Sequence, residues 1–210
     1  MKWFNKKYLL GFIIFILLVN CFLLYKLSNY KLSIVAYQTI LDNDMDKIQK
    51  METLGLHFDT SLRNNGMILN NIFVKDSLNR EIQLTDLFKK GKSKIFVSRF
   101  SRLCCEDCVV FSIQKAVSMA DSTGIDNIVF LGSYENTESL NLLRDQYGLQ
   151  GKEVYNTVDF LNIPIEESNR PCYFVLDSTL RIFDVFIPEM TSPNITNMYL
   201  SIIREKWFKL

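Results

Sequence analysis

The sequence predicts an α/β fold, a mixed β-sheet with helices on both faces, preceded by an N-terminal transmembrane helix. One long apolar run stands at the start of the chain, and strand-like and helix-like segments alternate from residue 67 onward. The chain has 210 residues, 48% of them apolar, which suffices for one domain with a buried core. We expect a signal anchor at residues 1–31, a helical stalk or linker at 32–66, and the α/β domain at 67–210.

The composition excludes several classes of protein. A content of 22% charged and 13% aromatic residues is not that of a disordered or low-complexity chain. The net charge is +1, but residues 1–31 contain five lysines and no acid, so the remaining chain is net acidic. A chain of this kind has no basic surface for nucleic acid. With one histidine and five cysteines, most histidine-based catalysis and most zinc frameworks are also excluded.

The N-terminal apolar run covers residues 9–25, about 26 Å of helix at ~1.5 Å per residue. Lys2, Lys6 and Lys7 precede it, which favours a cytoplasmic N-terminus. No small-x-small cleavage site follows, so we expect an uncleaved anchor in the cytoplasmic (inner) membrane, with the C-terminal domain in an extracytoplasmic, periplasmic space. The residues before Cys21 loosely resemble a lipobox, which leaves lipidation of Cys21 open.

The segment that follows is predicted to be a stalk. Leu41, Met45, Ile48 and Met51 recur at helical spacing, with fewer than three clean heptads for a dimer. A turn is expected at residues 64–66, which read Asn-Asn-Gly. The single histidine, His57, is expected to be a solvated side chain of this stalk or of a loop.

From residue 67 the pattern alternates between strands and helices. The expected strands cover residues 68–75, 81–84, 94–100, 127–132, 153–158, 172–177 and 180–187. The expected helical segments are a turn at 85–88, a helix at 105–120, a helix capped at 136–137 that stops at Gly148, and a last helix that begins at Ser192 and Pro193.

The chemically distinctive segment is a C-x-x-C pair, Cys105 and Cys108, at the end of a predicted buried strand and in the first turn of the next helix. The free N–H groups and the dipole of a helix start stabilise a thiolate there. Residues three apart on a helix face the same way, so a disulfide can close without backbone movement. A static disulfide in an exported protein would use the same spacing.

A second motif lies downstream, where Pro171 directly precedes the predicted strand 172–177, a tight turn and an antiparallel partner strand. Together with the C-x-x-C pair, it resembles the thioredoxin superfamily, specifically its membrane-anchored extracytoplasmic (TlpA/ResA-like) group, over residues 68–210. The resemblance implies a thioredoxin core with an N-terminal hairpin and no cofactor. It also implies that Cys105 is the attacking cysteine, Cys108 the resolving one and Pro171 a cis-proline.

The sequence departs from this family at two positions. Cys104 replaces the tryptophan before the first cysteine, and Arg170 stands where the family usually has threonine before the proline. Read from Cys104 the spacing is C-x-x-x-C, which resembles copper-delivering Sco-type proteins, but no histidine follows residue 57 to complete such a site.

Two further readings, a peroxiredoxin and a zinc site, are less well supported. Ser101 and Arg102 only approximate the residues around a peroxiredoxin cysteine, and the required proline is missing. A zinc site of Cys104, Cys105, Cys108 and Cys172 would use adjacent cysteines, which chelate poorly. We therefore expect no metal.

The function predicted from the sequence is thiol–disulfide exchange on protein disulfide substrates. Glu106 and Asp107 lie between the cysteines and disfavour a thiolate, which favours reduction, although Arg99 and Arg102 could offset their charge. A reductant outside the cytoplasm needs electrons, and the resemblance implies a membrane electron donor. The alternative is a non-catalytic binding or scaffold module on the same fold, which Arg170 and the acidic dipeptide would suit.

Overall fold

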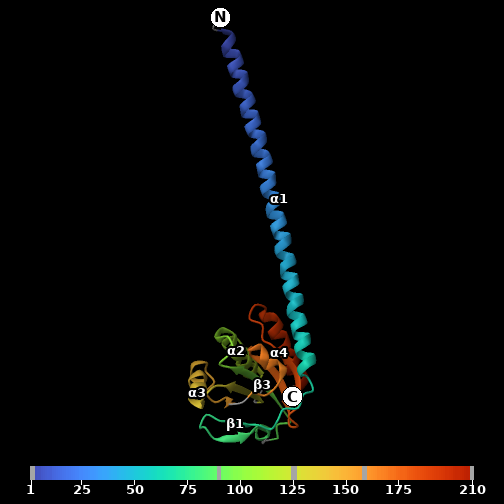
Figure 1. Ribbon diagram of the computed structural model, residues 1–210, viewed down its shortest axis with the longest axis vertical. Helices are drawn as coiled ribbons and strands as arrows, with labels where there is room; N and C mark the ends of the chain where they lie inside the picture. Colours follow the sequence, from blue (N-terminus) through green and yellow to red (C-terminus); the bar gives the residue numbers. More distant parts are fainter. Residues whose placement is uncertain (1–2, 89–90, 124–126, 158–159, 209–210) are drawn as a thin grey trace. The chain divides into compact units, whose positions relative to one another are not determined.

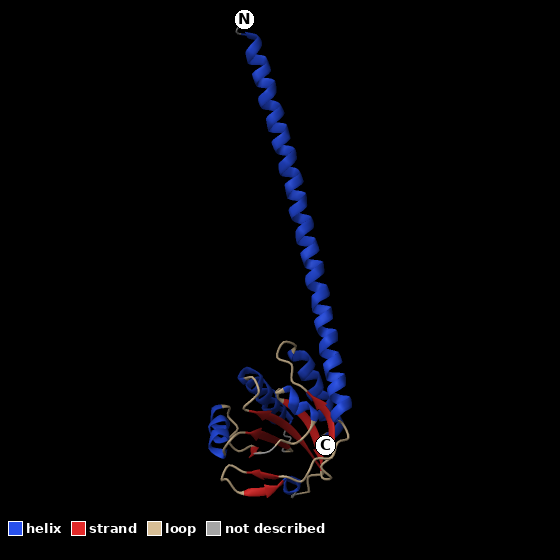
Figure 2. Ribbon diagram, viewed as in Figure 1, coloured by secondary structure: helices blue, strands red, loops and turns tan. Residues whose placement is uncertain are grey.

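The computed structural model describes residues 3–88, 91–123, 127–157 and 160–208 (Figure 1). The chain divides into two compact units, Met1–Leu54 and Gly55–Leu210. The first helix, α1 (Trp3–Asn64), makes up the described part of the first unit, and its last turns belong to the second. In the rest of the second unit, helices and strands alternate except at two hairpins, where β1 is followed directly by β2 and β6 by β7 (Figure 2).

Within the first unit, α1 contains one segment that is long and apolar enough to cross a membrane. This segment is Leu10–Ser28, 19 residues with a mean hydropathy of 2.3. Further along, the four apolar residues of the predicted stalk are exposed on the helix: Leu41, Met45, Ile48 and Met51. The helix predicted within the stalk is therefore present, and it is continuous with the apolar segment before it. The division at residues 31 and 32 stays a prediction.

The turn predicted after the stalk is confirmed. Helix α1 ends at Asn64, and Gly66 has a positive φ of 83°, a conformation that glycine adopts without steric cost. Two hydrogen bonds join this turn to the domain: Gly66 N–H donates to the Ile182 carbonyl over 2.8 Å, and Val185 N–H donates to Asn65 Oδ1 over 3.0 Å. The end of α1 is thus fixed to a strand of the second unit.

The second unit is built on one mixed sheet. Its strands are β1 (Phe73–Lys75), β2 (Glu81–Gln83), β3 (Lys94–Ser101), β4 (Ile128–Ser133), β5 (Glu153–Asn156), β6 (Cys172–Asp177) and β7 (Ile182–Phe186). Their order across the sheet is β2-β1-β5-β4-β3-β6-β7. Strands β3, β4 and β5 are mutually parallel, and β6 runs antiparallel to β3 and to β7. A parallel β3–helix–β4 unit is thus followed by an antiparallel hairpin and a final helix.

Besides the last turns of α1, the described residues of this unit form three α-helices and two short 3₁₀ helices. They are η1 (Leu84–Phe88), α2 (Glu106–Thr123), α3 (Thr137–Gln146), η2 (Pro164–Ser168) and α4 (Pro193–Trp207). Asn136 caps α3 by accepting the Ser139 N–H over 2.8 Å, and Pro193 occupies the first turn of α4, as the sequence predicted.

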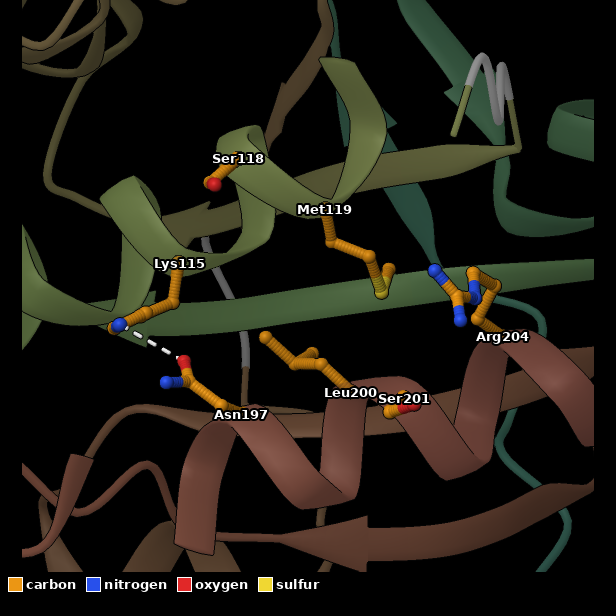
Figure 3. Close-up of a pocket in the computed structure, with 7 residues that line it drawn as sticks. All are labelled: Lys115, Ser118, Met119, Asn197, Leu200, Ser201 and Arg204. Carbon is orange, nitrogen blue, oxygen red and sulfur yellow. Dashed lines mark hydrogen bonds between the residues drawn. The ribbon is translucent and has the colours of Figure 1, made fainter. Parts of the chain in front are cut away.

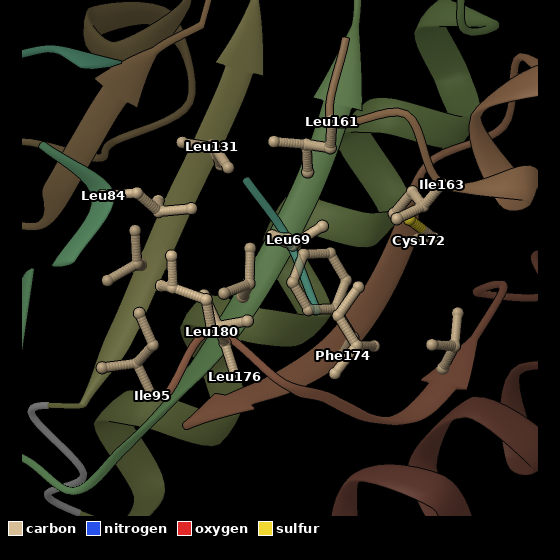
Figure 4. Close-up of a cluster of buried hydrophobic side chains, with 14 of the residues drawn as sticks. Leu69, Leu84, Ile95, Leu131, Leu161, Ile163, Cys172, Phe174, Leu176 and Leu180 are labelled. Atoms are coloured by element: carbon tan, nitrogen blue, oxygen red, sulfur yellow. The ribbon is translucent and has the colours of Figure 1, made fainter. Parts of the chain in front are cut away.

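Two apolar clusters lie on opposite faces of the sheet, because alternate residues of a strand point to opposite sides. In β3, Ile95 and Val97 belong to the cluster shown in Figure 4, whereas Phe96 and Phe100 belong to the other. The α-helices α2, α3 and α4 all contribute to the second cluster, and the 3₁₀ helices η1 and η2 contribute to the first. Both faces therefore carry helices, but only one carries α-helices in the described part of the chain.

The element boundaries differ from the prediction mainly at the N-terminal hairpin. The strand expected at 68–75 is reduced to β1 and an isolated bridge between Ile68 and Arg181, because residues 68 and 69 bond to the chain before β7 whereas β1 pairs with β2 and β5. The strand expected at 153–158 ends at Asn156, and residue 158 lies outside the described residues. So does Gly124, where the helix at 105–120 was expected to close.

Candidate active site

The three clustered cysteines lie where β3 turns into α2. Ser101 ends β3, and its carbonyl accepts the Cys104 N–H over 3.1 Å, which closes a turn. The Cys105 carbonyl accepts the N–H of Val109 over 3.0 Å, the first bond of the helix. Cys105 is therefore the N-cap residue of α2, and Cys108 is in its first turn.

The sulfur of Cys105 occupies the place that an oxygen takes in an ordinary N-cap. Its Sγ accepts the backbone N–H of Cys108 over 3.3 Å, the interaction that a serine or aspartate oxygen makes with the third helical residue. The Cys105 side chain is exposed to solvent. A reactive sulfur at this position is open to a large partner and faces the positive end of the helix dipole.

Cys108 lies in different surroundings. It is only partly exposed, and burial raises the pKa of its thiol to about 11, with further contributions from the hydrogen bond and charge of Cys105. The positive charge of Arg170 acts in the opposite direction. Cys108 therefore holds its proton at neutral pH, next to an exposed sulfur three residues away.

Cys104 is turned toward the protein interior. Its Sγ accepts the Ser101 N–H over 3.4 Å and lies 3.5 Å from Ser101 Oγ. The side chain is partly buried against the apolar cluster under α2. Cys104 and Cys105 are thus adjacent in sequence but differ in surroundings.

Cys172, the first residue of β6, is fully buried beside β3. Only 1% of its surface is exposed, and burial raises the pKa of its thiol to about 12. It shares a small pocket with Cys104, Arg99 and Arg170. All five cysteines are free thiols, and no group of three or more His, Cys, Asp or Glu among the described residues is placed to hold a metal ion.

The two arginines expected to offset charge at the thiols both have carboxylate partners. Arg99 is buried and forms an ion pair with Glu166 over 2.7 Å, with a further hydrogen bond to Thr157 Oγ1 over 2.9 Å. Arg102 forms an ion pair with Glu135, and both side chains are exposed. Each charge therefore has an opposite charge beside it, although Arg99 still acts to lower the pKa of the buried Cys172 thiol.

Glu106 and Asp107 form the first turn of α2, where carboxylates interact favourably with the helix dipole. Glu106 also accepts a hydrogen bond from the Tyr147 hydroxyl over 3.4 Å. Partial burial and the charge of Glu106 raise the pKa of Tyr147. The acidic dipeptide thus stabilises the helix that carries the cysteines.

The peptide bond between Arg170 and Pro171 is trans, which corrects the expectation of a cis-proline. Asn169 adopts a left-handed conformation, with φ of 50°, at the end of η2. This residue turns the chain toward β6, so the proline can keep the trans form that X–Pro bonds favour by about 0.5–1 kcal/mol. The Arg170 guanidinium donates from Nη2 to Glu189 Oε1 over 2.8 Å.

His57 is a second correction, because it is not a solvated histidine. Its ring stacks on Phe186 with centroids 4.4 Å apart and an interplanar angle of 6°. Thr60 and Asn64, on the same side of α1, are buried, so this side of the helix faces the domain. Burial lowers the pKa of His57, as does the charge of Arg170, whereas Glu189 raises it.

Sequence reasoning missed both His57 and Glu189 as neighbours of the site. The contacts that gather them join residues far apart in the chain, and no local spacing indicates such a cluster. In the sequence, two features could have drawn attention to them: His57 is the single histidine, and Glu189 is an acidic residue just after a predicted strand.

A further pocket lies between the second half of α2 and α4 (Figure 3). Lys115 Nζ donates to Asn197 Oδ1 across it over 2.8 Å. The other lining residues are Ser118, Met119, Leu200, Ser201 and Arg204. This pocket contains no thiol.

Neither a known family nor a curated protein matches the sequence. A comparison with solved structures finds proteins of similar fold and low sequence identity. A thioredoxin-like protein from Porphyromonas gingivalis is 17% identical and covers 70% of this chain and 97% of its own, with a TM-score of 0.48. A thiol:disulfide interchange protein from a Bacteroides species is 11% identical, covers 69% and 93%, and scores 0.47. A peroxidoxin from Mycobacterium tuberculosis is 10% identical, covers 68% and 97%, and scores 0.49.

Proposed function

We propose that this chain, whose sheet and helices form a thioredoxin-like fold, is a thiol–disulfide oxidoreductase that acts on protein disulfides through Cys105 and Cys108. One observation carries the proposal. The exposed Cys105 sulfur caps the start of α2 and accepts the N–H of Cys108, whose own thiol is half-buried three residues away. An exposed attacking sulfur and a protected resolving thiol are what two-step exchange requires.

The reaction follows from this asymmetry. The Cys105 thiolate attacks one sulfur of a substrate disulfide, forms a mixed disulfide and expels the first substrate thiolate. Cys108 then loses its proton and attacks the Cys105 sulfur, which forms the Cys105–Cys108 disulfide and releases the second substrate thiolate. Two electrons pass from the protein to the substrate, and the two substrate thiolates take up protons.

The direction we propose is reduction. Glu106 and Asp107 lie between the two cysteines and disfavour a thiolate on either of them, while Arg99 and Arg102 are paired with Glu166 and Glu135. A less stabilised thiolate makes the reduced form less stable and therefore a better electron donor.

The proposal is tested by reduction of insulin disulfides with the full chain in detergent micelles and dithiothreitol as the electron source. We expect turnover by the wild type and by Cys104→Ser, and none by Cys105→Ser. If the wild type only binds thiol proteins without turnover, the chain is instead a binding module on a thioredoxin-like fold.

We also propose that Leu10–Ser28 anchors the chain in the cytoplasmic membrane, with the cysteines on the extracytoplasmic side beside a membrane electron donor. The lysines at positions 2, 6 and 7 support this orientation. We expect the full chain in the membrane fraction and a fragment from residue 32 in the soluble fraction. External protease should cleave the domain in spheroplasts, and full protection there would contradict this orientation.

A further inference from the structure

We propose that α1 forms a parallel, two-stranded coiled coil with α1 of a second copy of this chain, through an apolar stripe at residues 30–62. This inference is independent of the proposed redox role of Cys105 and Cys108. It assigns a partner to one exposed side of a helix whose other side, in its last turns, packs on the domain.

The apolar residues of α1 follow a seven-residue repeat. With residue 34 at position a of the heptad abcdefg, positions a and d fall at residues 30, 34, 37, 41, 44, 48, 51, 55, 58 and 62. Eight of these ten residues are apolar or aromatic, and only Asp44 and Gly55 depart from the pattern. Steps that alternate between four and three residues are the pattern of a coiled-coil seam.

The structure extends this repeat beyond the predicted stalk. The four stalk residues predicted from the sequence cover fewer than three heptads, but α1 is one continuous helix from Trp3 to Asn64. The repeat begins at Tyr30, just after the apolar segment Leu10–Ser28, and reaches Leu62, which gives more than four heptads. A seam of about three to four heptads or more indicates a coiled coil.

In the first unit, this side of α1 is exposed. Five residues at positions a and d are 51–73% exposed there, namely Tyr30, Ile34, Leu41, Ile48 and Met51. No segment of the described chain therefore covers them. Because most of the stability of a helix comes from the packing of its apolar side, this stripe needs a partner in water. A helix with the same repeat fits it, and a second copy of this chain supplies one.

The last turns of α1, which belong to the second unit, leave the same side free. His57 stacks on a ring of β7, and Thr60 and Asn64 are buried, so the domain covers positions c and f. Phe58 and Leu62, at positions d and a, are 67% and 68% exposed. Positions c and f lie on the outer side of a coiled coil, so the domain and the second copy use different sides of the helix.

The charged residues near the seam fit a parallel pair of identical helices. Lys47 falls at position g and Glu52 at position e of the next heptad, which face each other across a parallel coiled coil. Asp44 places a carboxylate at position d, where Lys47 Nζ of the same chain forms an ion pair with it over 3.0 Å. A polar residue in the seam costs stability but fixes the register of the two helices.

The experiment measures the mass of the full chain in detergent micelles by sedimentation equilibrium, with the solvent density matched to that of the detergent. We expect the wild type to be a dimer. Ile48→Asp, at position a, should weaken dimerisation by about tenfold or more, because it places a second carboxylate in the seam. Asn43→Asp, at the outer position c, is the matched control and should leave the dimer unchanged. Asp44→Leu should strengthen the dimer, whereas Asp42→Leu at position b should not.

A cross-linking measurement tests the parallel register. In a chain whose native cysteines are all replaced by serine, oxidation with copper phenanthroline should join two copies of Met51→Cys, at position d, and should not join two copies of Asn43→Cys. If the cysteine-free chain does not fold, the sedimentation series, which keeps every native cysteine, decides alone.

A dimeric wild type that Ile48→Asp dissociates and Asp44→Leu strengthens supports the proposal. A monomeric wild type overturns it, as does an Ile48→Asp chain that dimerises as well as the wild type, because association would then come from the apolar segment Leu10–Ser28. Cross-linking of Asn43→Cys as strong as that of Met51→Cys also overturns it. Thermal unfolding of each variant shows that the domain has kept its fold.

Discussion

The start of α2 and the start of β6 each present a cysteine, and the two thiols have opposite surroundings. Cys105 is exposed at a helix N-cap, where its sulfur accepts an N–H, whereas Cys172 is 1% exposed on a central strand and burial raises its pKa to about 12. Cys108 is intermediate, half-buried with a pKa of about 11. The difference teaches that position in the fold, not the presence of a thiol, determines which cysteines can exchange.

The largest effect is expected when the exposed thiol is removed. Cys108→Ser should accumulate mixed disulfides with substrate proteins, because the resolving step is lost, and adding Cys105→Ser should abolish them. Non-reducing electrophoresis with mass spectrometry of the captured peptide measures both. Cys104→Ser is the matched control and should leave exchange intact. If trapping instead persists without Cys105 and requires Cys104, the reactive spacing is C-x-x-x-C and the comparison above is wrong.

The next prediction concerns the buried thiols. In Cys105→Ser, alkylation of Cys108 by iodoacetamide should be slow at pH 8 and rise about tenfold per pH unit, because burial still disfavours its thiolate. Cys172 should stay unlabelled over this range and react only after unfolding in guanidinium chloride. Labelling of native Cys172 as fast as that of Cys105 in the wild type would remove the distinction between the two regions.

A smaller effect is expected from the acidic dipeptide. The reduction potential of the Cys105–Cys108 disulfide should lie at or below roughly −200 mV, on the reducing side of the range of known thiol–disulfide exchange proteins. Changing Glu106 to Gln and Asp107 to Asn should raise it, by about 30 mV for each ~1.4 kcal/mol gained by the reduced form. Glutathione equilibration measures the change. A wild-type value close to that of a strong oxidant would rule out the proposed reducing role.

The smallest effect concerns the stability of the fold at low pH. Burial lowers the pKa of His57, so the unfolded chain takes up a proton first as the pH falls below about 6.5. The contribution of His57 to stability is therefore complete above pH 6.5 and declines until the lower folded pKa is reached. Urea unfolding at pH 7.5 and 5.5 should show a smaller loss in His57→Phe than in the wild type. Equal losses would contradict the buried, neutral ring.

Much of the fold was predictable from local patterns. The strand 172–177 and the Asn136 cap were predicted with their observed residues, because apolar alternation and capping preferences act within a few positions. The N-terminal strand was predicted too long, since Leu69 and Ile72 pack on the core without regular pairing and Ile68 forms only an isolated bridge. The apolar content of a segment does not show whether it pairs as a regular strand or only packs against the core.

The candidate site was predictable only in part. The spacing of Cys105 and Cys108 indicated a helix start, and the N-cap geometry agrees with that expectation. The trans state of Pro171 and the burial of His57 and Glu189 depend on how η2, α1 and the segment after β7 meet, and contacts between distant segments leave no periodic signal in one sequence. The surroundings of the thiols therefore needed the tertiary structure.

The packing of α4 has a consequence for how the chain is made. The helix that carries the cysteines shares its apolar cluster with Leu200 and Ile203, and Tyr199 stacks on Phe186 with ring centroids 4.2 Å apart. Tyr199, Leu200 and Ile203 belong to α4, which is synthesised after α2 and β7. Until it arrives, α2 lacks part of its cover and its thiols lack their final surroundings. The surroundings of Cys104, which packs against the same apolar cluster, are therefore complete only once α4 has folded against α2.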